Sequence, residues 1–203
     1  MIIKQFITGQ LENNTYLILD EESRKGVFID ANALTPEMIN ASKDYDIEYI
    51  LLTHGHFDHI LALNDFKEKF HAKALINEND QIVSDNLNGF TMVFGMPEVT
   101  PPKYDKYIND NEEISVGNLR FQVITTPGHT EGGVCYLIDD KLFSGDTLFR
   151  ESVGRTDLFG GNFEKLSDSV KNKLFKLDED ITVYPGHGAS TTIGHEKQFN
   201  EIL

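Results

Sequence analysis

The chain has 203 residues, with 18 Lys and Arg against 33 Asp and Glu, so its formal net charge is -15. Hydrophobic residues make up 39% and charged residues 25% of the sequence, which is an ordinary globular composition and excludes collagenous or largely disordered classes. Nucleic-acid binding draws much of its affinity from Lys and Arg, so an acidic chain without a basic run is not expected to bind nucleic acid. A chain of this length buries enough surface to fold without a metal or a disulfide, and we expect one domain over residues 1–203.

The compartment is predicted from the cysteine content and the N-terminus. Cys135 is the single cysteine and cannot form an internal disulfide, which fits a reducing compartment. The N-terminus shows no basic region followed by an apolar stretch, and the apolar runs of the chain are only a few residues long. We therefore expect a cytoplasmic protein without a membrane partner. We expect Cys135 to be a buried small apolar residue rather than a reactive thiol.

Short β-type runs open the chain, and we expect them to form an antiparallel meander. These runs lie at residues 2–8, 15–20 and 26–30. Thr35 followed by Pro36 predicts the N-terminus of a helix that runs to about Lys43. A buried strand at 49–52 then leads into a His-rich segment, and the apolar spacing after it predicts a helix that begins near Asp58.

Residues 79–107 are predicted to be a loop-rich insertion, because Asn88-Gly89 and three of the six prolines interrupt every period there. Two interpretations stay open for this segment. It can be a surface connection, or it can be a lid that carries Phe90, Met92 and Phe94 to a pocket.

The second half of the chain predicts further short strands and two helices. The strands are expected at 120–126, 134–138, 141–143 and 181–184. Asn162 is a candidate N-cap for a helix whose apolar residues recur at helical spacing from Phe163 to Leu174. A last helix is expected within 192–202.

The segment Thr53-His54-Gly55-His56-Phe57-Asp58-His59 carries three histidines and a carboxylate within six residues, directly after the predicted strand at 49–52. Chance placement is a poor explanation for this pattern. Protonated imidazoles crowded together would repel one another, whereas neutral imidazole nitrogen and carboxylate oxygen are ligands for zinc, iron or manganese. The segment therefore predicts a metal site.

Three further strands end in a glycine that is followed directly by a donor: His129, Asp146 and His187. Sites in α/β folds form where strand ends meet, so these donors are expected beside the His-rich segment. Seven donors are too many for one metal ion and suit two ions that share a bridging carboxylate.

We expect Asp146 to bridge two ions, each with three further donors. The first triad is His54, His56 and His129, and the second is Asp58, His59 and His187. Two ions at such a site can hold a bridging hydroxide and polarise a carbonyl, which predicts metal-assisted hydrolysis. We also assign a catalytic role to Asp58.

These motifs resemble the metallo-β-lactamase fold superfamily, in particular its glyoxalase II-like (hydroxyacylglutathione hydrolase-like) branch. The matching stretches are T-H-G-H-F-D-H at 53–59, P-G-H-T-E-G-G at 127–133, F-S-G-D-T-L-F at 143–149, G-R-T-D-L-F-G-G at 154–161 and Y-P-G-H-G at 184–188. The resemblance implies an α/β fold, a four-layer αββα sandwich with a dinuclear site at one edge of its two sheets. In the family's pattern the seven donors have the roles assigned above.

The resemblance implies a hydrolase that acts on a small acyl thioester of the S-D-lactoylglutathione type through a metal-bridging hydroxide, with a small-molecule substrate and two divalent ions, most simply zinc, with iron or manganese as alternatives. The branch's full-length enzymes add a helical C-terminal domain that contacts glutathione, whereas a short segment follows His187 here. The thiol carrier therefore stays open.

Three alternatives to thioester hydrolysis are kept. The motifs also resemble the persulfide dioxygenase branch, which uses one iron. A β-lactamase or lactonase uses similar ligands, and a non-catalytic metal-binding module would keep the site without turnover. The sequence does not indicate the oligomeric state.

Arg150 and Arg155 are candidate substrate-binding residues. The chain has only four arginines, and these two follow Asp146 closely. A guanidinium binds carboxylates bidentately, which suits an anionic substrate approaching an acidic protein. The alternative is an internal ion pair, for example of Arg155 with Asp157. His71 is expected to be a surface residue, and His195 is expected to be an ordinary residue at the start of a helix.

Overall fold

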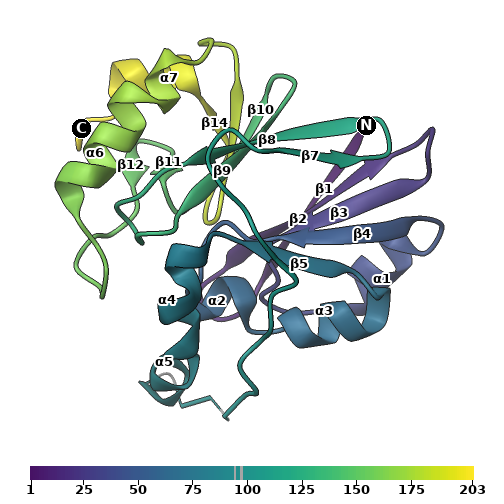
Figure 1. Cartoon of the computed structure of the whole chain (residues 1–203). Coiled ribbons are helices and arrows are strands. Elements are labelled where there is room, and N and C mark those ends of the chain that lie inside the picture. Colours follow the sequence, from purple (N-terminus) through teal and green to yellow (C-terminus); the bar gives the residue numbers. More distant parts are fainter. Residues whose placement is uncertain (94, 97) are drawn as a thin grey trace.

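The computed structural model describes residues 1–93, 95–96 and 98–203. Two six-stranded mixed sheets lie face to face, and helices cover the outer face of each, so that the layers follow the order αββα (Figure 1). This is the predicted sandwich. Among the described residues, no helix combines the length and the apolar character needed to cross a bilayer.

The first sheet comes from the N-terminal half of the chain, and its spatial order follows the sequence. Its strands are β1 (Ile2–Thr8), β2 (Asn13–Asp20), β3 (Lys25–Ile29), β4 (Asp46–Leu51), β5 (Lys73–Ile76) and β6 (Lys106–Tyr107). The strands β1, β2 and β3 form the predicted antiparallel meander, whereas β3 to β6 pair in parallel.

The second sheet comes from the C-terminal half and is antiparallel except for the pair of β10 and β13. Its strands in spatial order are β14 (Thr191–Thr192), β13 (Thr182–Pro185), β10 (Lys141–Gly145), β9 (Val134–Ile138), β8 (Leu119–Thr125) and β7 (Glu113–Val116). A separate ribbon joins β11 (Leu148–Phe149) and β12 (Ser152–Val153).

The helices fall into two groups, one for each half of the chain. The N-terminal group is α1 (Pro36–Ser42), α2 (Phe57–Ile60), α3 (Leu63–Phe70), the 3-10 helix η1 (Glu78–Asp80), α4 (Gln81–Asp85) and α5 (Leu87–Val93). The C-terminal group is α6 (Phe163–Asn172), the 3-10 helix η2 (Leu174–Lys176) and α7 (Ile193–Phe199). Thr35 and Asn162 are N-caps, as predicted, and accept hydrogen bonds from Met38 N and Lys165 N.

Three apolar cores hold the four layers together, and β2 shows how the sequence builds two of them. Successive side chains of a strand point to opposite faces. Leu17 and Leu19 therefore join the core under α1 and α3, whereas Tyr16 and Ile18 join the core between the sheets. A third core lies between the second sheet and α6 and α7.

The expectation of a loop-rich insertion at 79–107 was wrong for residues 81–93, which are helical, and holds for residues 98–105, which form neither helix nor strand. The helices α4 and α5 occupy 81–93 despite Gly89. Burial outweighs the weak local signal, because Leu87 is buried in the core under the first sheet and Phe90 packs against that core. Met92 is exposed, and Phe94 lies outside the described residues.

The predicted helix near Asp58 is interrupted between α2 and α3. The backbone after β3 lies against the break, where Ala31 N donates to His59 O at 2.7 Å and Ala62 N donates to Ala31 O at 2.9 Å. These contacts fix the ring of His59 close to the end of β3.

Replacement of Phe121 by Ala tests the core between the sheets. Phe121 is fully buried on β8, so we expect the substitution to lower the free energy of unfolding by about 3–5 kcal/mol in urea denaturation. Phe199→Ala is the control, because Phe199 is 49% exposed and its loss is expected to change the unfolding free energy by about 0.5 kcal/mol or less. Equal effects of the two variants would contradict this core assignment.

Candidate metal centre

Seven predicted donor side chains meet at one edge of the two sheets. His54, His56, Asp58 and His59 follow β4 of the first sheet. His129, Asp146 and His187 follow β8, β10 and β13 of the second sheet. The site therefore joins both halves of the chain.

The donors form overlapping groups in which the ligand atoms lie within 4.8 Å of one another. One group is His54, His56 and His129, and another is Asp58, His59 and His187. These two groups have the composition of the two predicted triads.

Asp146 lies between the two groups. Its Oδ2 is 3.6 Å from His129 Nε2 and 3.6 Å from His187 Nε2, and its Oδ1 is 3.4 Å from His59 Nε2. One carboxylate thus faces imidazoles of both groups, which is the placement that a bridging carboxylate needs.

Backbone carbonyls orient two of the imidazole rings. His129 Nδ1 lies 2.7 Å from Arg155 O, and His187 Nδ1 lies 2.9 Å from Leu11 O. A carbonyl oxygen only accepts, so Nδ1 of each ring is the donor. Nε2 of each ring then faces the other donors: His129 Nε2 lies 2.8 Å from His56 Nδ1, and His187 Nε2 lies 3.1 Å from Asp58 Oδ2. A ring that is oriented through Nδ1 and offers Nε2 to the site is typical of metal-binding histidines.

Unpaired nitrogen atoms give the test of whether a cation fits. His54 Nε2 and His56 Nε2 are both buried without a hydrogen-bond partner among the described residues. Buried polar atoms without partners cost free energy, and a shared cation satisfies such lone pairs at once. The donor set therefore fits a divalent metal ion.

The protonation states of His54, His56 and Asp146 also suit metal binding. Burial, and then the neighbouring imidazoles, hold the pKa of His54 well below its ordinary value, and burial lowers the pKa of His56 to about 3. Burial raises the pKa of Asp146, but His59, His129 and His187 outweigh it and bring that pKa below the ordinary value. At neutral pH the site thus offers neutral imidazoles at His54 and His56 and an ionised Asp146, which are the forms that bind metals.

Asp30 is a buried residue of the site that the sequence reasoning missed. Its Oδ2 accepts a hydrogen bond from His59 Nδ1 at 2.7 Å, and its Oδ1 accepts one from Thr53 N at 2.9 Å. Asp30 follows β3 directly, so the signal that found His129 and Asp146, a donor at a strand end, was present here too.

Asp80 is a second buried carboxylate that the sequence reasoning missed. It contacts the loops on either side of the site through Gly55, Thr130 and Gly132. It lies at the end of η1, within the insertion that was expected to be irregular, and no motif singled it out.

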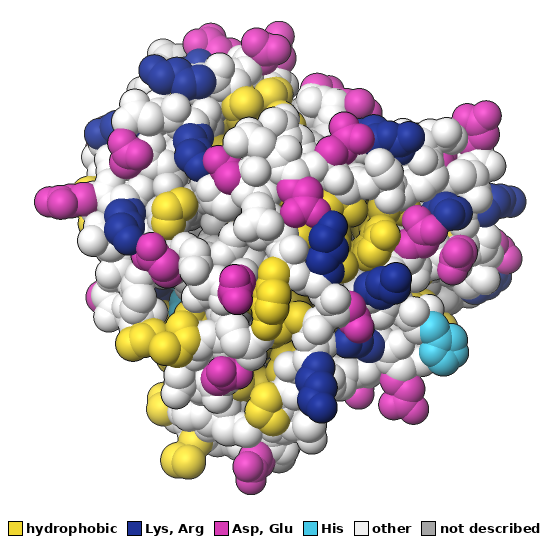
Figure 2. Space-filling model, in the orientation of Figure 1, with side chains coloured by type: hydrophobic (Ala, Val, Ile, Leu, Met, Phe, Trp, Pro, Cys, Tyr) yellow, Lys and Arg dark blue, Asp and Glu magenta, His cyan; other side chains and the backbone are white. Residues whose placement is uncertain are grey.

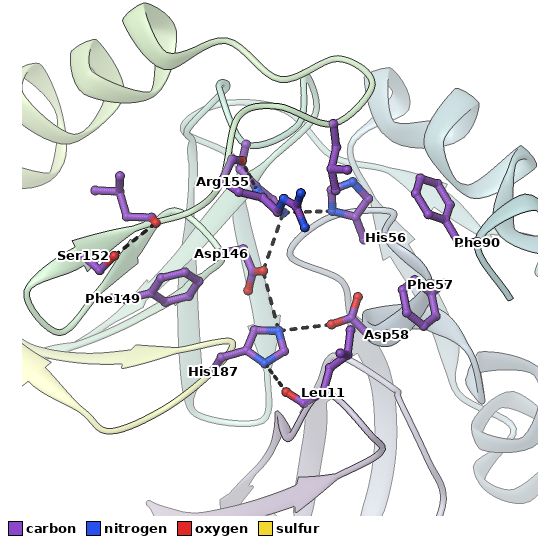
Figure 3. A pocket seen from close by; sticks show the side chains of 13 residues that line it. Leu11, His56, Phe57, Asp58, Phe90, Asp146, Phe149, Ser152, Arg155 and His187 are labelled. Carbon is purple, nitrogen blue, oxygen red and sulfur yellow. Dashed lines mark hydrogen bonds and ion pairs between the residues drawn. The ribbon is translucent and has the colours of Figure 1, made fainter. Parts of the chain in front are cut away.

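A cavity of about 540 Å³ opens above the donors (Figure 3). His56, Asp58, His129, Asp146 and His187 line its polar side. Apolar side chains make up most of the remaining wall: Leu11, Phe57, Phe90, Phe149, Val153 and Leu158. The cavity can hold a small molecule whose polar centre faces the donors.

The two candidate arginines occupy different places. Arg155 lines the cavity, and its guanidinium, which is 61% exposed, binds both carboxylate oxygens of Asp157 at 2.7 and 2.8 Å. Arg155 therefore lines the cavity and also forms the ion pair with Asp157 that was the alternative prediction. Arg150 lies outside this cavity, in a separate hollow beside Thr182 and His195.

Three other residues lie as expected. Cys135 is fully buried, and burial raises the pKa of its thiol to about 11. His71 is exposed at the C-cap of α3. His195 lies in the first turn of α7 with Nε2 2.9 Å from Glu151 Oε1.

The surface agrees with the acidic composition. On the face drawn in Figure 2, Lys and Arg side chains are scattered among Asp and Glu and form no basic patch.

Comparison with known proteins identifies curated relatives along most of the chain. Hydroxyacylglutathione hydrolase GloC of Haemophilus influenzae is 34% identical over 198 residues, which cover 95% of this chain and 93% of that protein. The probable metallo-hydrolase YqgX of Bacillus subtilis is 40% identical over 158 residues, which cover 76% of this chain and 74% of that protein.

Solved structures share the fold along nearly the whole chain. The B3 metallo-beta-lactamase BLEG-1 matches with a TM-score of 0.91 and 34% identity, covering 100% of this chain and 99% of that chain. ETHE1 from Myxococcus xanthus matches with a TM-score of 0.81 and 32% identity, covering 99% of this chain and 84% of that chain. TTHA1623 in a di-iron-bound form matches with a TM-score of 0.87 and 32% identity, covering 98% of this chain and 100% of that chain.

A sequence profile of the metallo-beta-lactamase superfamily matches residues 11–187, which include all seven donors. The fold, the cluster of histidines and carboxylates and the named relatives agree with this match. The chain belongs to the metallo-beta-lactamase superfamily, as a metallo-hydrolase-type member with a cluster suited to divalent metals.

Proposed function

We propose that this protein is a hydrolase that cleaves a small acyl thioester, of the hydroxyacylglutathione type, with two bound metal ions. The observation that carries the proposal is the convergence of seven donors, five of which line a cavity with mainly apolar walls. The similarity to GloC over 95% of the chain supports the thioester class.

The metal ions are assigned to the two triads. His54, His56 and His129 would hold one ion, Asp58, His59 and His187 the other, and Asp146 would lie between them. Zinc is the first choice, and iron or manganese suits the same mixed nitrogen and oxygen donors. When bound, such ions lower the pKa of water and stabilise the oxyanion that forms at a carbonyl.

The chain's own residues orient the reactants. Asp58 lies on the cavity wall 3.1 Å from His187 Nε2, and its pKa is lowered because the histidines, His59 first, outweigh the effect of burial. Its ionised carboxylate would accept a hydrogen bond from the attacking water, which is the catalytic role that we assign to it. A thiolate leaves without a strong general acid, so the leaving group needs no proton donor in the cavity.

The apolar wall holds the rest of the substrate. Phe90 and Phe149 lie on opposite sides of the donors in Figure 3 and give the space between them apolar walls. The guanidinium of Arg155 faces the same space, where it can attract an anionic group of the substrate. Arg150, which was predicted to bind substrate as well, has no place in this cavity and stays a prediction.

The test of the proposal is turnover together with metal content. Purified protein loaded separately with zinc, iron or manganese is assayed on S-D-lactoylglutathione, other acyl thioesters, oxygen esters, β-lactams and glutathione persulfide. We expect thioester hydrolysis that chelation abolishes and metal restores.

Three results would contradict the proposal. Oxygen consumption with glutathione persulfide and one bound iron would favour a persulfide dioxygenase. Preferential opening of β-lactams would favour a lactamase. Two bound ions without any turnover would favour a non-catalytic metal-binding module.

Asp146→Ala tests the bridging role. Loss of the carboxylate between the triads leaves the imidazoles facing each other, so we expect metal content and thioester hydrolysis to fall together. Elemental analysis and the thioester assay measure the two effects. If the variant keeps two tightly bound ions, Asp146 does not bridge them.

Arg155→Ala and Asp157→Asn test substrate attraction in opposite directions. Because Arg155 is exposed, its removal is expected to raise KM for an anionic thioester about two- to fivefold with little change in kcat. Asp157→Asn frees the guanidinium and is expected to lower KM. Unchanged KM in both variants would remove Arg155 from the substrate site, and a neutral thioester is the control substrate.

A further inference from the structure

Asp80 joins the two loops that supply the first triad. Its side chain is 0% exposed. Oδ2 accepts hydrogen bonds from Gly55 N and from Thr130 Oγ1, both at 2.8 Å, and Oδ1 accepts one from Gly132 N at 2.6 Å. Gly55 lies between His54 and His56, and Thr130 follows His129 directly. One carboxylate therefore connects the chain segments of all three donors of this triad.

The contact is close enough that both loops need glycine. A Cβ on Gly55 would come within 2.7 Å of Asp80 O, and a Cβ on Gly132 would come within 2.6 Å of Asp80 N. Real Cβ atoms do not approach backbone atoms this closely. The two loops thus pack directly on the turn that carries Asp80.

The second triad is held by other groups. His59 Nδ1 is paired with Asp30 Oδ2, and His187 Nδ1 donates to Leu11 O. Asp80 has no hydrogen bond to either histidine or to the groups that orient them.

We propose that Asp80 is a positioning residue that sets the distance between the His54–His56 loop and the His129 loop, and thereby controls the affinity of the first metal position alone. The proposal rests on the proposed dinuclear function. In this proposal Asp80 holds the two loops so that His56 Nδ1 lies 2.8 Å from His129 Nε2. Both nitrogen atoms then lie where one ion can bind them.

Asp80→Asn is the principal test. An amide nitrogen cannot accept from Gly55 N or Thr130 Oγ1, so the loops lose part of their clamp while the side-chain volume stays nearly constant. We expect zinc affinity at one of two sites to fall about 10- to 100-fold and the other to stay within about threefold. Competition with a chromophoric chelator measures both affinities, and elemental analysis after dialysis is expected to change from two ions to one.

The site that loses affinity is identified in two further backgrounds. In a His129→Ala variant, which lacks the first position, Asp80→Asn is expected to have no further effect on the remaining ion. In a His187→Ala variant, which lacks the second position, Asp80→Asn is expected to weaken binding of the remaining ion by the same factor of about 10 to 100.

Asp20→Asn is the matched control. Asp20 is also a buried carboxylate with three acceptor contacts, to Ser23 Oγ, Asn118 N and Glu22 N, but it lies outside the metal site. The Asp20→Asn variant is expected to bind two ions like the natural chain.

Thr130→Val is the second test, for the case in which Asp80→Asn fails to fold. It removes a single hydrogen bond to Asp80 and is expected to reduce the affinity of the first metal position about three- to tenfold. Thr130→Ser keeps the hydroxyl and is expected to keep the affinity.

The proposal would be overturned if Asp80→Asn binds both ions with natural affinity or loses both equally. It would also be overturned if Asp20→Asn shows the same loss as Asp80→Asn. The readout is metal affinity and uses no substrate. A natural chain that binds two ions but hydrolyses no thioester would therefore refute the proposed function and leave the role of Asp80 intact.

Discussion

Five imidazoles and two carboxylates are held against one another at the junction of two sheets, and this crowding is the constraint on which the site depends. Without a cation, His54 Nε2 and His56 Nε2 have no hydrogen-bond partner among the described residues. Buried polar atoms without partners oppose folding. A bound metal ion would satisfy such atoms, so the free energy of its binding to the folded chain would add to the stability.

Strand direction explains why donors distant in sequence reach the same place. β10 and β13 pair in parallel, and β8 is antiparallel to β9, which is in turn antiparallel to β10. All three donor strands of the second sheet therefore run in the same direction, and their C-terminal ends lie at one edge. β4 brings the His-rich segment to this edge from the first sheet, and Val134 N donates to Thr53 O across the junction.

The sequence singled out the seven clustered side chains because their signal is local. A ligand-type residue directly after a β-type run can be recognised without knowing the fold, and the resemblance of the motifs supplied the sandwich. The same rule applied to Asp30, but a single Asp after a strand resembles an ordinary turn residue until His59 is seen beside it. Asp80 gave no local signal, since its role exists only through Gly55 and Gly132, which are distant in sequence.

The insertion shows the opposite failure, in which local signals were present and misleading. Asn88-Gly89 is typical of a turn, yet Asn88 Nδ2 donates to Val99 O while Asn88 Oδ1 accepts from Val99 N. The side chain that disfavours a helix in isolation here fixes the segment after α5 against it. Burial of Leu87 supplies the remaining stabilisation, and sequence periodicity does not reveal that contact.

The charge of the site also depends on the metal. The chain carries a net charge of -15, and the guanidinium of Arg155 is already paired with Asp157, so arginine alone gives the cavity little attraction for an anion. Two divalent ions bound at the site would outweigh the charges of Asp58 and Asp146 and make the floor of the cavity positive. An anionic thioester would then be drawn to the donors by the same ions that the imidazoles hold. Loss of either ion would accordingly weaken substrate attraction as well as chemistry, which makes the geometry of each triad, and the buried carboxylates that fix it, part of the binding site.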